Sequence, residues 1–379
     1  PPRWLAPAVV AAAAVAIPVL ATQAVLFSEP LFAALLAGAI IAADRDPPRP
    51  LLAGTLAALA LLTRSIAVAA GAGIVVYLLV ARRVPRRVVL RAAAPVLVAA
   101  LGWGAWVLTH GQDIDPAFAL NYGSYRNVIA QTGLGAIGAS LPDLPRPLGA
   151  LTLAWLGVPV LYPILGVAAL AVGVYGLALL TRRSAVGWTL IAYLAILAVW
   201  PYAGDRFLWA VLPWLALAWT AGALEIARRF PRVRVAVLLL AACVVLGYGH
   251  YEVRGFAGRW WGTTARGISA NFRELLPAVA ALPGDAIVAS ADEALVWLYT
   301  GRRAVPFYIW SRRGREEVEP SAAEHRAYLE RQGVTHVLLT GGGSGSARQV
   351  DALLGAYPGW LTIIRGWPGS RALFRVGDP

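Results

Sequence analysis

The chain has 379 residues, of which 59% are hydrophobic and 14% are charged, and its mean hydropathy is +0.65. An ordinary soluble domain carries about 25% charged residues, so this composition excludes a soluble globular protein and predicts a membrane protein. The 33 basic residues are all arginine, a usage typical of GC-rich bacterial genes. We therefore expect a multi-pass protein of a bacterial plasma (inner) membrane.

The start of the chain and its single cysteine add two expectations. The sequence contains no Met and opens on Pro1, without the charged segment that begins a signal peptide, so we expect a fragment whose first helix and first outer loop are missing. Cys243 is the one cysteine, which excludes both a disulfide framework and a cysteine metal site.

Apolar runs follow one another along the first two thirds of the chain. A transmembrane helix needs about 20 mainly apolar residues, and nine crossings follow if each run is long enough or paired with a neighbour. The sequence therefore predicts a mainly α-helical, polytopic transmembrane bundle in residues 1–250. The runs fall at about residues 4–27, 30–43, 51–63, 65–81, 88–109, 151–180, 186–203, 207–227 and 234–250.

The placement of arginine predicts how these crossings are oriented. Cytoplasmic connections are enriched in Lys and Arg, and most arginines of this region lie in alternate connections. This pattern puts the beginning of the chain inside and everything after residue 250 outside. The arginines concerned are Arg3, Arg45, Arg49, Arg82, Arg83, Arg86, Arg87, Arg91, Arg182, Arg183, Arg228, Arg229, Arg232 and Arg234.

Two outer turns stand out. Both flanks of residues 51–81 carry the cytoplasmic arginine signature, so this stretch must be two short helices that turn at "LLTRSIA". Glu29 lies at another outer turn, with Pro30 in the first turn of the next helix. An ionised carboxylate inside hydrocarbon is costly, so we expect Glu29 to face the outer water boundary. Four arginines lie on outer connections, where the topology rule disfavours them: Arg64, Arg126, Arg146 and Arg206.

A long outer connection, residues 110–150, joins two of the crossings. Loops of this length are usually functional or disordered, and we expect a short amphipathic helix near residues 124–133. Asp113 and Asp115 could ligate a metal together with His110. A solvated loop is the favoured interpretation, because no other ligand cluster adjoins them in the sequence.

Residues 251–379 have the composition of a soluble domain. Helices are predicted from the cap Ser269 onward, over "ADEALVWLYTG" and over "SAAEHRAYLERQG"; strands are predicted at "DAIVAS" and "THVLLTG", and a hairpin at the end. We therefore expect a small extracytoplasmic α/β domain. Its 15 arginines balance 12 acidic residues, so the domain has no patch for nucleic acid.

The segment "THVLLTGGGSGSARQVDALL" in this domain combines a strand, glycines and a helix. Such an order also begins nucleotide sites. The glycine spacing is not G-x-G-x-x-G and a P-loop lysine is missing, so a flexible turn is the favoured interpretation.

Three stretches together resemble a known family. "SEPLF", "LAGTLAALALLTRSIAV" and "GDRFLWAVLPWL" are similar in order and sidedness to the GT-C superfamily of membrane glycosyltransferases, nearest to the protein mannosyltransferase and aminoarabinose-transferase types. The resemblance covers residues 1 to about 250. It implies an inverting hexosyl or pentosyl transferase that moves a sugar from a polyprenyl-phosphate donor to a lipid, protein or glycan acceptor on the outer face of the membrane.

The resemblance also implies roles for individual residues. Glu29 matches the acid of the family's second outer turn, and Arg206 matches the Arg of its "R-Y-L-L-P-x-x-P" pattern, with Phe207 for Tyr, the first Pro missing and Pro213 in place. Guanidiniums stabilise the charge that develops on a leaving phosphate, and a carboxylate takes the proton of the acceptor. A second carboxylate can hold a divalent metal or orient the acceptor. We expect catalytic roles for Glu29 and Arg206, and substrate contacts from Arg64, Asp113, Asp115, Tyr122, Tyr125, Arg126 and Asp205.

Other interpretations remain open. Arg64 could extend to lipid headgroups, and Asp205 could form a plain surface pair with Arg206. A transporter or flippase of a lipid-linked anion would also use arginine in the membrane, although transporters tend to show internal repeats, and the sequence shows none. A membrane sensor whose outer domain binds a ligand is a third hypothesis.

Overall fold

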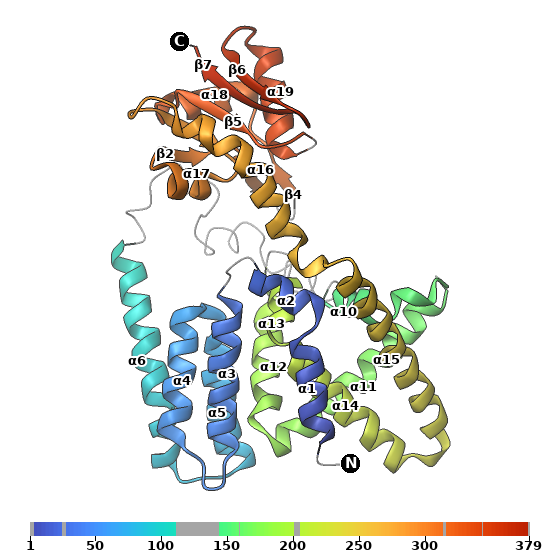
Figure 1. Cartoon of the computed structure of the whole chain (residues 1–379). Coiled ribbons are helices and arrows are strands. Elements are labelled where there is room, and N and C mark those ends of the chain that lie inside the picture. The colour runs from blue at the N-terminus through green and yellow to red at the C-terminus, as the bar shows by residue number, and fades with distance from the viewer. Residues whose placement is uncertain are drawn as a thin grey trace. The chain divides into compact units, whose positions relative to one another are not determined.

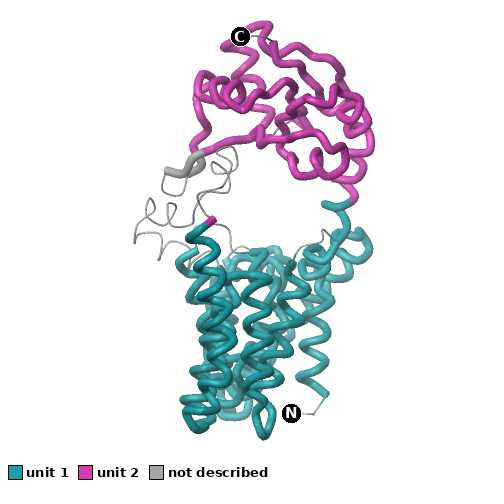
Figure 2. The backbone as a smooth tube through the Cα atoms, turned by 90° about the vertical axis from the view of Figure 1, so that its left-hand side faces the viewer, with its two compact units in different colours: residues 1–109, 134–265 teal, residues 110–133, 266–379 magenta. Residues whose placement is uncertain are grey.

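The computed structural model describes residues 4–24, 28–110, 144–158, 160–200, 205–313, 316–342 and 344–377. The chain divides into two compact units, which Figure 2 shows in different colours. Unit 1 comprises residues 1–109 and 134–265, and unit 2 comprises residues 110–133 and 266–379. The sequence predicts a domain boundary after residue 250, whereas the helix that contains this residue continues to Ala257.

The regular elements among the described residues of unit 1 are all helices (Figure 1). Helix α3 packs against α4, α5 against α12, and α14 against both α1 and α11. The helices are α1 (Leu5–Ala14), α2 (Ile17–Ala24), α3 (Glu29–Asp44), α4 (Pro50–Thr63), α5 (Val68–Val76), α6 (Arg86–His110), α10 (Arg146–Thr152), α11 (Leu161–Arg183), α12 (Ala185–Ala198), α13 (Asp205–Ala210), α14 (Leu212–Arg229), α15 (Arg234–Ala257) and the beginning of α16 (Thr263–Ala280).

Three helices among the described residues are long and apolar enough to cross a membrane: Arg86–His110, Leu161–Arg183 and Pro231–Ala257. The pair α1 and α2, bent by 48°, makes a fourth if it is one span. These helices indicate a membrane protein, but they are fewer than the nine crossings expected. Other apolar runs form helices that are too short: α4 and α12 have 14 residues each, or about 21 Å, against the ~30 Å of a hydrocarbon core.

The stretch 51–81 forms two helices, as the arginine pattern predicts. Helix α4 ends at Thr63, a short 3₁₀ turn covers Ser65–Ala67, and α5 follows directly. Arg64, between the two helices, has an extended backbone with φ −150° and ψ 122°. This conformation ends α4 and reverses the chain, which places the Arg64 side chain at one end of the helix pair.

Helices α11 and α14 approach each other through glycines. A Cβ atom added at Gly176 would overlap the carbonyl oxygen of Ala218, and one added at Gly222 would overlap the carbonyl oxygen of Val172. Small residues spaced four apart let helix backbones come this close, as in many helix pairs of membrane proteins.

The break between α1 and α2 is closed by a carboxylate from a distant part of the chain. The backbone N–H of Ile17, at the start of α2, donates to both side-chain oxygens of Glu252 in α15, with N–O distances of 3.0 and 3.2 Å. A free N–H at a helix start otherwise needs water or a cap. Glu252 is buried, so it stabilises the break from within the protein.

Helix α3 is held at its last residue by α12. The Asp44 carboxylate accepts hydrogen bonds from Ser184 Oγ at 2.5 Å and from the backbone N of Ala185 at 2.8 Å. A carboxylate at a helix N-terminus satisfies its free N–H groups and interacts favourably with the helix dipole. The end of α3 therefore caps the beginning of α12.

Unit 2 is the expected small α/β domain. Its main sheet has the strand order β2-β1-β5-β7-β6; β1 is parallel to β2 and β5, whereas β7 is antiparallel to β5 and β6. Strands β3 (Ser311–Arg313) and β4 (Glu316–Val318) form a separate antiparallel pair. The main strands are β1 (Ile287–Ser290), β2 (Arg303–Pro306), β5 (His336–Leu339), β6 (Leu361–Trp367) and β7 (Arg371–Val376).

Helices cover both faces of this sheet. Residues of α18 (Ala322–Arg331) and α19 (Gly345–Ala356) share one core cluster with Val337, and residues of α16 and α17 (Glu293–Thr300) share another with the next strand residue, Leu338. Successive side chains of a strand point to opposite faces, so the continuous apolar run of β5 fits a central strand buried on both sides.

Local signals in this domain are confirmed with one exception. Helix α17 ends at Gly301, which has φ 67°, and α18 begins at Ser321 with a capping box to Glu324. The expected cap Ser269 is wrong, because α16 starts at Thr263 and runs through it. Serine favours caps over helix interiors, but here the helix begins seven residues, or about two turns, before the position that the cap indicates.

Candidate functional site

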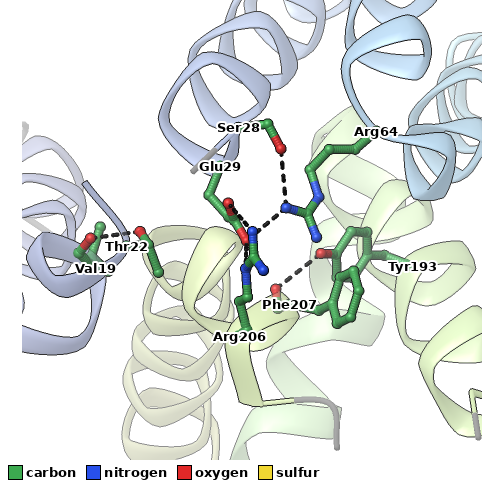
Figure 3. A network of polar contacts seen from close by, with 8 residues as sticks. All are labelled: Val19, Thr22, Ser28, Glu29, Arg64, Tyr193, Arg206 and Phe207. Carbon is green, nitrogen blue, oxygen red and sulfur yellow. Dashed lines mark hydrogen bonds and ion pairs between the residues drawn. The ribbon is translucent and has the colours of Figure 1, made fainter. Parts of the chain in front are cut away.

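Three helix ends of unit 1 bring together one acidic and two basic side chains (Figure 3). Glu29 is the first residue of α3, Arg64 follows the last residue of α4, and Arg206 is the second residue of α13. Pro30, in the first turn of α3, fits there because its missing N–H would have no helical partner. We call these three residues the Glu–Arg cluster.

Glu29 bridges the two guanidiniums. Its Oε1 accepts from Arg64 Nη1 at 2.6 Å and from Arg206 Nε, and its Oε2 accepts from Arg206 Nη2 at 3.1 Å. Arg206 thus holds the carboxylate through two parallel bonds, the fork geometry that only arginine provides. The two ion pairs fix the distance and the angle between the guanidiniums.

Arg64 is fixed from three directions. Its Nη1 also donates to Ser28 Oγ at 3.2 Å, and its Cζ lies 4.8 Å from the centroid of the Phe207 ring. A cation over an aromatic face is stabilised by the ring quadrupole. The side chain is 12% exposed, so it lies inside the protein and does not extend to lipid headgroups.

Arg206 is the accessible member of the cluster. Its side chain is 43% exposed, against 2% for Glu29. Two guanidiniums and one carboxylate leave a local charge of +1 on these three side chains. A ligand that reaches the cluster therefore meets a positively charged guanidinium whose position is set by a buried carboxylate.

Aromatic side chains form the wall beside the cluster. Tyr193 of α12 is buried and donates its hydroxyl to the carbonyl oxygen of Phe207 at 2.9 Å. Its ring stacks on Phe32, and the Trp200 ring meets Phe207 edge to face. Buried tyrosine hydroxyls usually find such a partner. The bond ties α12 to the first turn of α13, and so supports Arg206.

Sequence reasoning identified the three members of the cluster but missed its wall. Glu29, Arg64 and Arg206 were each singled out because charge is rare in this region. Tyr193 and Phe207 lie in apolar runs with no distinguishing spacing. The signal that could have found Tyr193 is its hydroxyl, which needs a partner when the surrounding run is apolar.

The expectation that Glu29 faces water is wrong, since its side chain is 2% exposed. The physical reason is that Arg64 and Arg206 supply the charge compensation that water would otherwise give.

Asp205 is exposed at the start of α13, where a negatively charged side chain interacts favourably with the helix dipole. Arg206 is paired with Glu29, so a surface pair with Asp205 alone does not describe its environment.

The other expected contacts fall outside the described residues. These are Asp113, Asp115, Tyr122, Tyr125, Arg126 and the helix expected at 124–133. His110, proposed with the two aspartates as a metal trio, is the last residue of α6. Arg146, the remaining outer arginine, begins α10.

A divalent metal does not fit the Glu–Arg cluster. Both oxygens of Glu29 already accept from guanidiniums, and two positive groups next to a carboxylate repel a cation. Within the described ranges, no three His, Cys, Asp or Glu side chains lie close enough together to hold a metal ion.

The cluster suits an anion instead. A guanidinium donates to phosphate oxygens in a planar fork, and its fixed orientation removes the cost of ordering a long side chain when a ligand binds. The comparisons with protein-family models, curated proteins and solved structures yield no significant match. Any function therefore rests on the geometry of the cluster and on the sequence resemblance.

Proposed function

We propose that this chain is a membrane glycosyltransferase that takes a sugar from a polyprenyl-phosphate donor, with the Glu–Arg cluster binding the donor phosphate. The observation that carries the proposal is the pairing of buried Glu29 with two guanidiniums, one of which, Arg206, is exposed. The three stretches that carry the family resemblance each contribute one member of this cluster, although Glu29 and Arg206 are 177 residues apart in the sequence.

The reaction places a specific demand on such a cluster. The bond between the anomeric carbon of the sugar and the phosphate oxygen breaks, and that oxygen keeps the electron pair. An acceptor oxygen bonds to the same carbon from the opposite face and loses its proton. Negative charge grows on the leaving phosphate, and a fixed guanidinium stabilises it more strongly in the transition state than in the ground state.

The three residues take different parts in this proposal. Arg206 contacts the phosphate oxygens, because it is the exposed member. Arg64 and Glu29 are positioning residues. Glu29 binds both guanidiniums, and Arg64 donates to Ser28 and lies over the Phe207 ring. With both oxygens engaged, Glu29 is poorly placed to accept a proton from the acceptor, and we assign the general base to another residue.

The arginine pattern supports an outer location for this chemistry. Glu29 begins α3, whereas Arg45 and Arg49 follow the opposite end of the same helix. Arginines concentrate on the cytoplasmic side of membrane proteins, so the Glu–Arg cluster belongs to the outer end of the bundle. We propose that unit 2, which follows α15, is extracytoplasmic for the same reason.

The test compares three proteins in membranes: wild type, Arg206→Lys and Arg206→Ala. Release of polyprenyl phosphate is measured from a panel of labelled polyprenyl-phosphate sugars, with lipid, peptide and glycan acceptors. We expect Arg206→Ala to lower turnover about a hundredfold, as for other preorganised donors, and Arg206→Lys to lower it less, because lysine keeps the charge but loses the fork. The donor KM should change less than turnover.

Arg182→Ala serves as the matched control, since Arg182 is an exposed arginine in the last turn of α11. This variant should transfer sugar at the wild-type rate. If the Arg206 variants fold, insert and also transfer sugar at that rate, Arg206 is a headgroup anchor and the proposal is wrong.

The transporter hypothesis has one observation in its favour, the broken pair α1 and α2. Transporters use the free ends of broken helices to bind substrate. Here the N–H of Ile17 at the break is bonded to Glu252, so this helix end is already satisfied inside the protein. Movement of an intact lipid-linked sugar across vesicles, without release of polyprenyl phosphate, would support a transporter over the transferase.

A further inference from the structure

Unit 2 contains a small cavity of about 250 Å³ at one edge of its main sheet. Its lining includes Ser290 at the end of β1, Glu293 at the start of α17, Tyr308 after β2, and Ser344, Gly345 and Ser346 at the start of α19. This volume lies below the roughly 300–1,000 Å³ of sites that take drug-sized ligands, so the cavity suits a molecule the size of one sugar ring.

The topology of the sheet explains why a cavity forms here. From β1 the chain crosses to β2 on one side, and it later returns to β5 on the other side of β1. The connections that leave β1 and β5 therefore diverge at the carboxyl ends of these parallel strands. In open α/β sheets, ligands bind in the crevice at such a point.

The wall made by α19 offers hydrogen-bond donors. The first N–H groups of a helix have no partner within the helix; here Ser344 Oγ accepts from Ala347 N and leaves the N–H groups of Gly345 and Ser346 at the cavity. Ser346 is 4% exposed and lines the cavity, so its side chain belongs to the same wall.

Gly345 brings this wall close to an aromatic ring. A Cβ atom added at Gly345 would overlap the ring of Tyr308. Glycine thus lets the start of α19 and the tyrosine ring form a continuous wall, with an apolar face beside the polar groups.

The opposite wall offers an acceptor. Glu293 is 6% exposed and lines the cavity. Glu293 already interacts with another group of the protein. A carboxylate provides about four lone-pair sites, so Glu293 can accept further hydrogen bonds from a ligand. Ser290, fully buried, adds a hydroxyl that accepts from Asp292 N.

These two walls carry opposite preferences for charge. The helix start favours anions, and the Glu293 carboxylate disfavours them. A neutral molecule with several hydroxyls satisfies both walls, because each hydroxyl can accept from an N–H and donate to a carboxylate. We infer that unit 2 binds a neutral monosaccharide unit in this cavity, through Glu293 and the Ser344–Ser346 turn. This inference does not depend on the transfer reaction proposed for unit 1.

The test uses the whole chain in lipid nanodiscs, because detergents with sugar headgroups would compete with the added sugars for the cavity. Binding of mannose, galactose, glucose and arabinose is measured by calorimetry, with inorganic phosphate as the anionic probe. We expect saturable binding of at least one of the sugars and weaker binding to Glu293→Gln by about tenfold or more, since hydrogen bonds to charged groups are the strong ones. Ser346→Val, which removes the hydroxyl and fills space, should also weaken binding.

Glu274→Gln is the matched control, because Glu274 is a carboxylate of the same unit that is about half exposed and pairs with Arg371 at 2.8 Å. Its sugar affinity should equal that of wild type. Hydrogen exchange of the wild-type chain keeps the test decisive if a variant unfolds: sugar should increase protection at the start of α19. Absence of saturable sugar binding, protection only elsewhere, or phosphate binding that excludes the sugar would each overturn the inference.

Discussion

Replacing Glu29 by Gln should destabilise unit 1 strongly, although the volume of the side chain barely changes. The substitution removes the carboxylate that compensates Arg64 and Arg206, and it leaves two guanidiniums facing each other across an amide. From the sequence alone, with Glu29 on an exposed turn, the same substitution would be nearly neutral, as most surface changes are. The structure therefore reverses the expected outcome.

The size of the effect follows from how deeply each partner is buried. Removing one partner of a buried ion pair costs about 3–5 kcal/mol, and this range applies to Arg64, which is 12% exposed. Arg206 is 43% exposed, so solvent screens its loss to well below 1 kcal/mol. The Gln amide oxygen still accepts one hydrogen bond, which offsets about 1 kcal/mol of the stability lost. We expect a net loss of about 2–4 kcal/mol in the free energy of unfolding, by the same reasoning.

A double-mutant cycle in nanodiscs measures this directly. Glu29→Gln, Arg64→Met and the double variant are unfolded by denaturant, and the coupling energy should be about 1–3 kcal/mol, because the two residues are in contact. Asp46→Asn is the control: Asp46 pairs with Arg82 at 3.0 Å but is 90% exposed, so it should change stability by less than about 0.5 kcal/mol. If Glu29→Gln is no more harmful than Asp46→Asn, the bridge does not stabilise the bundle.

Three further predictions concern other parts of the chain. Gly176→Leu should destabilise unit 1 by at least about 1–3 kcal/mol, the range for overpacking, whereas Gly166→Leu in the same helix has open space around it; thermal unfolding of the two variants compares them. Burial lowers the pKa of His325 from 6.5 to about 4, so the unfolded chain binds the extra proton and the stability of unit 2 should fall by about 3 kcal/mol as pH drops from 6.5 to 4. The stability of His325→Gln, followed by hydrogen exchange, should lack this slope. Reporter fusions after Arg87 and after His250 should read cytoplasmic and external, respectively; a cytoplasmic signal after His250 would reverse the proposed orientation.

The local structure of unit 2 could be predicted because its signals are local. Ser321 and Glu324 make the capping box that their spacing indicates, and Gly301 ends α17 in the left-handed conformation that glycine permits. The continuous apolar run of β5 marks it as a central strand. Each of these features depends on residues within a few positions of one another.

The number of membrane spans was not predictable in the same way. Apolar runs show where chain can be buried, but not whether a helix continues through them. The run at 4–27 breaks at Val15 and Ala16, just before Pro18 in α2, and the N–H of Ile17 at this break is bonded to Glu252, more than 230 positions away. The run at 207–227 divides between α13 and α14 before Pro213.

The candidate site was predictable in its members and not in its assembly. Arg64 and Arg206 were conspicuous because arginine is disfavoured on outer turns, and Glu29 because it interrupts an apolar stretch. No spacing rule connects positions 29, 64 and 206, so their contact and the burial of Glu29 follow only from tertiary structure. The hydrogen bond from Tyr193 to the carbonyl oxygen of Phe207 also depends on tertiary structure, although the hydroxyl in an apolar run indicates that some partner exists.

Helix α3 has a carboxylate at each end, and each is bound to a different partner helix. Glu29 holds the guanidiniums from α4 and α13, and Asp44 caps α12. The helix has 16 residues, so it sets a fixed length of about 24 Å between the two attachments. Inserting one alanine near its middle would rotate one attachment by about 100° relative to the other, so that both could not form together. Helix α3 therefore sets the distance between its two attachments, and it ties the position of Arg64 and Arg206 to the far end of the bundle.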